Sequence, residues 1–269
     1  MRQLLTFDCA GETLGATLDG ESGRVGVLIV TGGTQTRIGS HRMFERLSAA
    51  LAANGYPCFR FDRRGVGDSD GLDAGFRGNG EDISAAAQAF RARADGLESI
   101  IGFGLCDGAT SLALFAGPAK LSGLILVNPW LVEAEPDAPP PAAIKHHYRQ
   151  RLLSVEGWQK LLTGSVSYKK LLKGVAKVIT DRQPSGLAEE TAEALATAKL
   201  PIELILALDD ATAVAAADVW RSDTFARHLS GVTTQTTVIE TDSHTFARPR
   251  DSASLLSATL TALGRLGGN

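Results

Sequence analysis

The stretch GFGLCDGATS, residues 102–111, places a cysteine at the centre of a Gly-x-Cys-x-Gly pattern. This spacing is typical of a nucleophile on a sharp turn from a strand into a helix, where the flanking residues must lack side chains. Such a turn puts the Cys106 sulfur at a helix N-terminus, where free N–H groups and the helix dipole favour a thiolate. A free cysteine is otherwise most often a small buried residue. Gly104 and Gly108 favour the nucleophile here.

A cysteine nucleophile needs a base, and the base needs an acid that orients it. The segments LALDDATA and ETDSHTFARP follow two later apolar runs and supply these groups in the order nucleophile, acid, base. We expect His244 to be the base, because it alone among the five histidines combines this order with a strand-end position. We expect Asp210 to be the acid, because it lies further into its loop than Asp209, which stays the alternative.

An oxyanion intermediate would require two backbone N–H donors. The N–H of Asp107 directly follows the nucleophile, and its carboxylate is expected to cap the next helix and point away from the sulfur. The second donor is expected in the loop after VGVLIV, where Gly33 is the first candidate and Thr34 the next.

Arg37 and Arg42 lie in and just after this same loop. One of them could bind a carboxylate or phosphate of a substrate. Ion pairing with Asp62 or Asp68 is an equal alternative.

The elements that position these residues follow from the hydrophobic pattern. Two short antiparallel strands are expected over 3–9 and 12–20, followed by buried strands over 25–30, 57–62, 98–105, 121–129, 201–208 and 234–240. Helices are expected over 41–54, 81–94, 107–116, 214–229 and 251–265. Strands separated by helices at this spacing predict a mostly parallel sheet, which binds ligands at the carboxyl ends of its strands.

The alternation breaks after Pro129. Residues 130–199 contain a proline cluster and helical patterns without a convincing strand, so we expect 1–129 and 200–269 to form one α/β core and 130–199 a helical cap. The cap is rich in basic residues, which has three interpretations. These residues could form a solvated face, attract an anionic or carrier-linked substrate, or contact a membrane surface. They are Lys145, Arg149, Arg151, Lys160, Lys169, Lys170, Lys173 and Lys177.

The composition narrows the function classes. A net charge of −3 over 269 residues gives no reason to expect a nucleic-acid partner. Three scattered cysteines predict neither a disulfide framework nor a zinc site and suit a reducing compartment. The apolar runs are far shorter than a membrane span and the N-terminal stretch is unlike a signal peptide, so a cytoplasmic protein is expected. VTGGTQTRIG lacks the spacing of a dinucleotide loop, and no cofactor or metal is expected.

Four segments carry a resemblance to a known family. They are GGTQTRIGSHR (32–42), FDRRGVGDS (61–69) within YPCFRFDRRGVGDSDG (56–71), GLCDGA (104–109) and DSHTFAR (242–248). The second resembles the R-G-x-G-x-S loop of the esterase and peptidase branch of the α/β-hydrolases. Together they resemble the exosortase A system-associated type 1 hydrolases, which accompany bacterial exopolysaccharide and protein-sorting gene clusters.

This resemblance implies an α/β-hydrolase fold, with a mostly parallel sheet, helices on both faces and a helical cap. It also implies a catalytic triad of Cys106, Asp210 and His244. The sequence departs from many relatives at residues 31–33, where TGG stands in place of a His-Gly motif.

A thiol nucleophile also narrows the substrate class. A thiolate leaves a tetrahedral intermediate more readily than an alkoxide does, so attack on a plain ester or amide tends to revert. The attack reverts less often on thioesters, lactones and activated esters. We therefore expect acyl transfer or hydrolysis on a small thioester or activated ester through an acyl-Cys106 intermediate. The alternative is a non-catalytic ligand-binding or scaffolding protein of the same fold.

Overall fold

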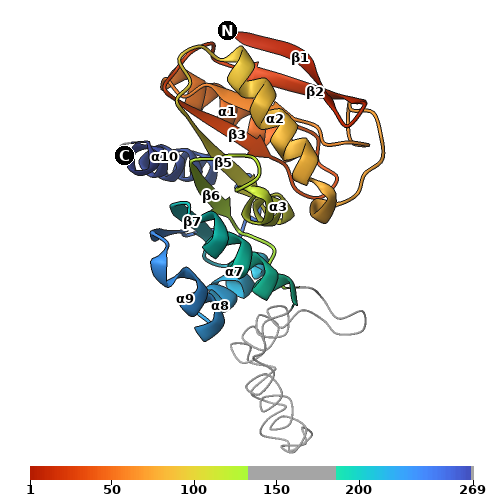
Figure 1. Cartoon of the computed structure of the whole chain (residues 1–269). Coiled ribbons are helices and arrows are strands. Elements are labelled where there is room, and N and C mark those ends of the chain that lie inside the picture. Colours follow the sequence, from red (N-terminus) through yellow and green to blue (C-terminus); the bar gives the residue numbers. More distant parts are fainter. Residues whose placement is uncertain (133–185, 268–269) are drawn as a thin grey trace, which may run out of the picture.

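The computed structural model describes residues 1–132 and 186–267, and their strands form one eight-stranded sheet with the order β1-β2-β4-β3-β5-β6-β7-β8 (Figure 1). The strands are β1 (Arg2–Cys9), β2 (Glu12–Asp19), β3 (Val25–Val30), β4 (Cys58–Phe61), β5 (Ser99–Leu105), β6 (Gly123–Val127), β7 (Ile202–Ala207) and β8 (Thr234–Ile239). The first two pair antiparallel, β2 is antiparallel to β4, and the strands from β3 to β8 run parallel. The predicted mostly parallel sheet is confirmed.

Helices cover both faces of this sheet. They are α1 (Met43–Ala53), α2 (Gly80–Arg93), α3 (Asp107–Phe115), α7 (Gly186–Ala198), α8 (Ala211–Trp220), α9 (Asp223–His228) and α10 (Pro249–Leu266), with short 3-10 turns η1 (Ser40–Arg42), η2 (Phe76–Gly78) and η3 (Leu229–Gly231). Helices α1 and α10 pack against each other on one face, while α2 and α3 pack against each other on the other face (Figure 1).

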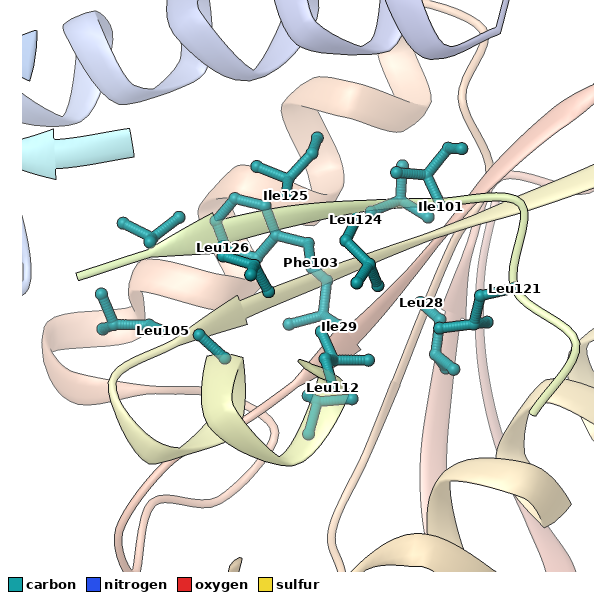
Figure 2. Close-up of a cluster of buried hydrophobic side chains, with 14 of the residues drawn as sticks. Leu28, Ile29, Ile101, Phe103, Leu105, Leu112, Leu121, Leu124, Ile125 and Leu126 are labelled. Carbon is teal, nitrogen blue, oxygen red and sulfur yellow. The ribbon is translucent and has the colours of Figure 1, made fainter. Parts of the chain in front are cut away.

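The core lies between the central strands and these helices. Figure 2 shows apolar side chains of β3, β5 and β6 meeting Leu112 of α3. Leu28, Phe103 and Leu124 are fully buried, as expected for parallel strands covered on both faces. The register aligns the carboxyl ends of the strands, with Val30 paired to Gly104. The loops after β3, β5, β6, β7 and β8 therefore emerge at one edge of the sheet.

One predicted helix, 214–229, is two helices in the structure. Helix α8 ends at Trp220, and Ser222 begins α9 by accepting a hydrogen bond from the N–H of Phe225 at 3.4 Å. A serine followed by Asp223 is an N-terminal capping signal. This local signal outweighs the helical periodicity that runs through it.

Helix α7 belongs to the range 130–199 that the sequence assigned to the cap. It packs against α3 and α9 of the core and buries Leu187, Thr191 and Leu195. The proline cluster and the basic residues of the predicted cap fall within 133–185, outside the described residues. No helix in the described ranges is long and apolar enough to cross a membrane.

Candidate active site

Cys106 forms the sharp turn between β5 and α3. Its backbone has φ 59° and ψ −128°, a conformation that residues with side chains rarely adopt. A Cβ on Gly104 would lie 2.7 Å from the Cα of Ala109, and one on Gly108 would lie 2.6 Å from the carbonyl oxygen of Val30. Both distances are too short for real carbon atoms, so the turn requires glycine at both flanking positions.

Hydrogen bonds from three directions hold this strained residue. The N–H of Cys106 donates to the carbonyl of Val127 at 3.0 Å, which extends the pairing of β5 with β6. Its own carbonyl accepts from the N–H of Ala109 at 3.1 Å and from the N–H of Trp130 at 3.2 Å. Because surrounding backbone fixes both of its peptide groups, Cys106 keeps one orientation at the carboxyl edge of the sheet.

Asp210 lies at the end of β7 and begins α8. Its Oδ2 accepts a hydrogen bond from the N–H of Ala213 at 2.9 Å, and the same oxygen lies 3.0 Å from Nδ1 of His244. Asp210 is buried, whereas the neighbouring Asp209 is exposed and contacts the carbonyl of Thr241 through its backbone. The structure therefore brings Asp210, rather than Asp209, to the histidine.

His244 lies in the loop after β8 and contacts both of its predicted partners. Hydrogen bonds with Asp210 and then with the Cys106 side chain raise the pKa of His244 to about 10, against the opposing effect of burial. A carboxylate can only accept, so Nδ1 carries a proton and the other ring nitrogen faces the sulfur. Three residues from three separate loops thus form a continuous chain of contacts.

Asn128 is a residue of this region that the sequence analysis missed. It is fully buried, has φ 42°, and directly precedes Pro129 at the end of β6. Its Nδ2 donates to the carbonyl of His244 at 3.1 Å, and its Oδ1 accepts from the N–H of Ala207 at 2.9 Å. One side chain therefore joins β6, β7 and the histidine loop. The available signal was a polar residue directly after the buried apolar run GLILV.

A second contact reaches the histidine loop from the loop after β3. Nε2 of His41 lies 3.0 Å from Oγ1 of Thr245, the residue that follows His244. His41 has φ 42° and is exposed. Nothing in its sequence context distinguished it from an ordinary residue near a helix start.

The loop after β3 meets the nucleophile turn through a contact that the sequence did not predict. The N–H of Gly33 donates to Oδ1 of Asp107 at 2.6 Å. The expectation that this carboxylate caps α3 is wrong, because its Oδ1 bonds to the loop after β3 instead of to an N–H of the helix. The carboxylate also touches Gly32, where an added Cβ would lie 2.2 Å from Oδ1. The N–H of Gly33, which was expected to bind an oxyanion, therefore already donates a hydrogen bond to a carboxylate of the chain.

The two arginines predicted near this loop both pair with carboxylates of the chain itself. Arg37 forms an ion pair with Asp62 and another with Asp68, the latter 2.8 Å from Nη2 to Oδ2. These are the two partners that the sequence offered as the alternative to substrate binding. Arg42 instead pairs with Glu45, 2.8 Å from Nε to Oε2. The Arg37 contacts fix the loop after β3 against the loop after β4.

The two other cysteines, Cys9 and Cys58, are buried in strands β1 and β4. Burial raises the pKa of the Cys9 thiol to about 11, with a smaller contribution from nearby Asp82. Burial likewise raises the pKa of Cys58. Both thiols are therefore protonated at neutral pH. Over residues 1–132 and 186–267, no cluster of three or more His, Cys, Asp or Glu side chains is arranged to hold a metal ion.

Comparison with solved structures supports the fold. An esterase from Pyrococcus furiosus superposes with a TM-score of 0.67 at 16% identity, covering 99% of this chain and 91% of the esterase. A lidless α/β serine hydrolase from Xanthomonas campestris superposes with a TM-score of 0.60 at 16% identity, covering 98% of this chain and 94% of that hydrolase. The thioesterase domain of the curacin biosynthetic pathway superposes with a TM-score of 0.60 at 16% identity, covering 97% of this chain and 99% of that domain. At such low identities these likenesses establish the α/β-hydrolase fold.

Sequence comparison assigns the family. No curated protein sequence matches the chain. The family model described as serine aminopeptidase, S33, matches residues 26–248, a range that begins in β3 and includes the turn at Cys106 as well as Asp210 and His244. The match covers most of the chain, and we conclude that this α/β-hydrolase belongs to the serine aminopeptidase S33 family of hydrolases.

Proposed function

We propose that the protein is a cysteine-dependent acyl hydrolase or acyltransferase that acts on thioesters or activated esters. The observation that carries the proposal is the contact chain from Asp210 through His244 to Cys106, with Cys106 held on a strained turn. The arrangement matches the general requirement for a nucleophile, a base and an orienting acid.

The first half of the reaction forms the acyl-enzyme. An imidazolium beside a sulfur favours the thiolate, which attacks the acyl carbon and forms the carbon–sulfur bond. The tetrahedral intermediate collapses as the bond to the leaving thiol or alcohol breaks. The imidazole nitrogen facing the sulfur supplies the proton that this leaving group needs. Asp210 holds the ring by its Nδ1–H and stabilises its positive charge.

The second half releases the acyl group. Neutral His244 now takes a proton from water or from another acceptor, which attacks the carbonyl of acyl-Cys106. The carbon–sulfur bond breaks, and the thiolate and imidazolium are restored. A thiolate is a good leaving group in both halves, which favours thioester and activated-ester substrates over plain esters and amides.

The sequence resemblance supports a biological setting for this chemistry. The four segments that resemble exosortase A system-associated hydrolases favour a role beside bacterial exopolysaccharide or protein-sorting systems. An anionic or carrier-linked acyl group is the substrate form that the basic residues of the predicted cap favour.

Intact-protein mass spectrometry after incubation with a panel of acyl-thioesters tests the proposal. Wild-type protein is expected to gain the mass of one acyl group, located on Cys106, and to release free acid or transfer product. Cys106→Ala is expected to lose both signals, while the matched control Cys9→Ala keeps them. Full turnover by Cys106→Ala, or acylation at another residue, would contradict the proposal.

A further inference from the structure

Asp107 contributes two groups to the same small region. Its backbone N–H follows the nucleophile and is the first expected oxyanion donor. Its carboxylate is hydrogen-bonded to the second expected oxyanion donor, the N–H of Gly33, which donates to Oδ1 at 2.6 Å. The short distance is typical of a bond to a charged acceptor. Across the described residues, the carboxylate has no other hydrogen-bond donor.

This contact sets a condition on any substrate. An acyl oxygen that develops negative charge cannot share the Gly33 N–H with a carboxylate, since both need the same donor and repel each other. The carboxylate must therefore rotate away before that N–H can stabilise the intermediate. Asp107 is half-buried and its bond to Gly33 is exposed, so a displaced carboxylate loses a short hydrogen bond that only water or a donor on the substrate can replace.

We propose that Asp107 is a specificity-determining residue, which selects acyl groups bearing an O–H or N–H donor on the carbon next to the carbonyl. The proposal rests on the proposed acyl-Cys106 chemistry. Such a donor lies two bonds from the reacting carbonyl carbon, beside the acyl oxygen that displaces the carboxylate from Gly33, and it can therefore bind that carboxylate. The exchange keeps both groups hydrogen-bonded. A plain alkyl chain offers no donor and leaves the displaced carboxylate to water alone.

Two thioesters of equal chain length test this inference, propionyl- and lactoyl-N-acetylcysteamine, which differ by one hydroxyl group. For the wild type, kcat/KM for the lactoyl compound is expected to exceed that for the propionyl compound by about tenfold, the size of one hydrogen bond to a charged group. Asp107→Ala is expected to bring the ratio close to one, chiefly by faster turnover of the propionyl compound. Asp107→Asn keeps an acceptor for Gly33 without the charge, and its ratio is expected to lie between those of the wild type and Asp107→Ala.

Asp209→Ala is the matched control, because it removes an exposed carboxylate from a neighbouring loop, and it is expected to keep the wild-type ratio. Acylation of Cys106 by both thioesters, at a ratio that Asp107→Ala and Asp107→Asn leave unchanged, would overturn this inference alone. Acylation by neither thioester in the wild type or either variant would contradict the proposed function and the inference with it.

Discussion

In the proposed mechanism, the reactivity of Cys106 depends on its contact with His244. The pKa of His244 is raised to about 10 by its contacts with Asp210 and the cysteine, so the ring is protonated through the neutral range. A positive charge in contact with the sulfur stabilises the thiolate, which is the reactive form of cysteine.

We predict that iodoacetamide modifies Cys106 faster in the wild type than in His244→Ala at pH 6, 7 and 8, because the variant lacks the cation that lies beside the sulfur. At pH 7 the rate in His244→Ala is expected to be about tenfold lower than in the wild type. Peptide mass spectrometry at each pH measures the labelled fraction.

Cys9 and Cys58 serve as internal controls in the same sample. Burial raises the pKa of both thiols, so they are expected to stay unlabelled in the folded protein. A wild-type profile that follows that of His244→Ala would show that the histidine does not activate the sulfur.

The positions of the candidate residues could be predicted where their order along the chain sets them, and a side-chain contact could not be predicted where its partner lies far away in the sequence. Cys106 and His244 were identified by the glycine spacing and by strand ends, and the structure brings them into contact. The Asp107 side chain was predicted wrongly, because a local capping rule was applied to it. Its actual partner is Gly33, which approaches only when β3 and β5 pair in the folded sheet.

At the scale of elements, the strand–turn–helix unit around Cys106 depends on how closely α3 approaches the end of β3. We predict that Gly108→Ala lowers the free energy of unfolding by about 1–3 kcal/mol, because its Cβ would overlap the backbone of Val30 and Thr31. Acylation of Cys106 should fall with it, since the turn must shift. Urea unfolding measures the first effect and mass spectrometry the second.

Gly264→Ala is the matched control for this substitution. Gly264 lies in α10, and an added Cβ there meets no other atom within 4 Å. Alanine is expected to stabilise this helix by about 0.5–1 kcal/mol through its better helix propensity. Equal effects of the two substitutions would refute the close approach of α3 to β3.

Most elements could be predicted because buried parallel strands appear as short apolar runs. The bounds of β3 and β7 differ from prediction by at most one residue at each end. The boundary between α8 and α9 was missed, because periodicity was weighed above the Ser222 cap. The bridge made by Asn128 was also missed, since its partners come from the end of β7 and from the loop after β8.

At the scale of the whole molecule, the sheet order brings together loops that are far apart in the sequence. The parallel strands β5, β6, β7 and β8 lie side by side, so the loops bearing Cys106, Asn128, Asp210 and His244 meet at one edge. The site therefore exists only in the folded sheet, and the protonation of His244 is linked to global stability.

We predict a pH-dependent contribution of His244 to that stability, measured in a Cys106→Ser background where the nucleophile does not titrate. Asp210 is the largest cause of the raised pKa and is retained in this background. The folded pKa lies above the unfolded value of about 6.5, so the stabilisation is complete below pH 6.5 and is lost as pH rises toward about 10. The difference in unfolding free energy between Cys106→Ser and Cys106→Ser/His244→Gln should therefore shrink over this interval, by at most about 1.4 kcal/mol per pH unit. Urea unfolding at pH 6, 8 and 10 measures it, and a difference that stays constant or grows with pH would show that the folded protein does not hold His244 in its charged form.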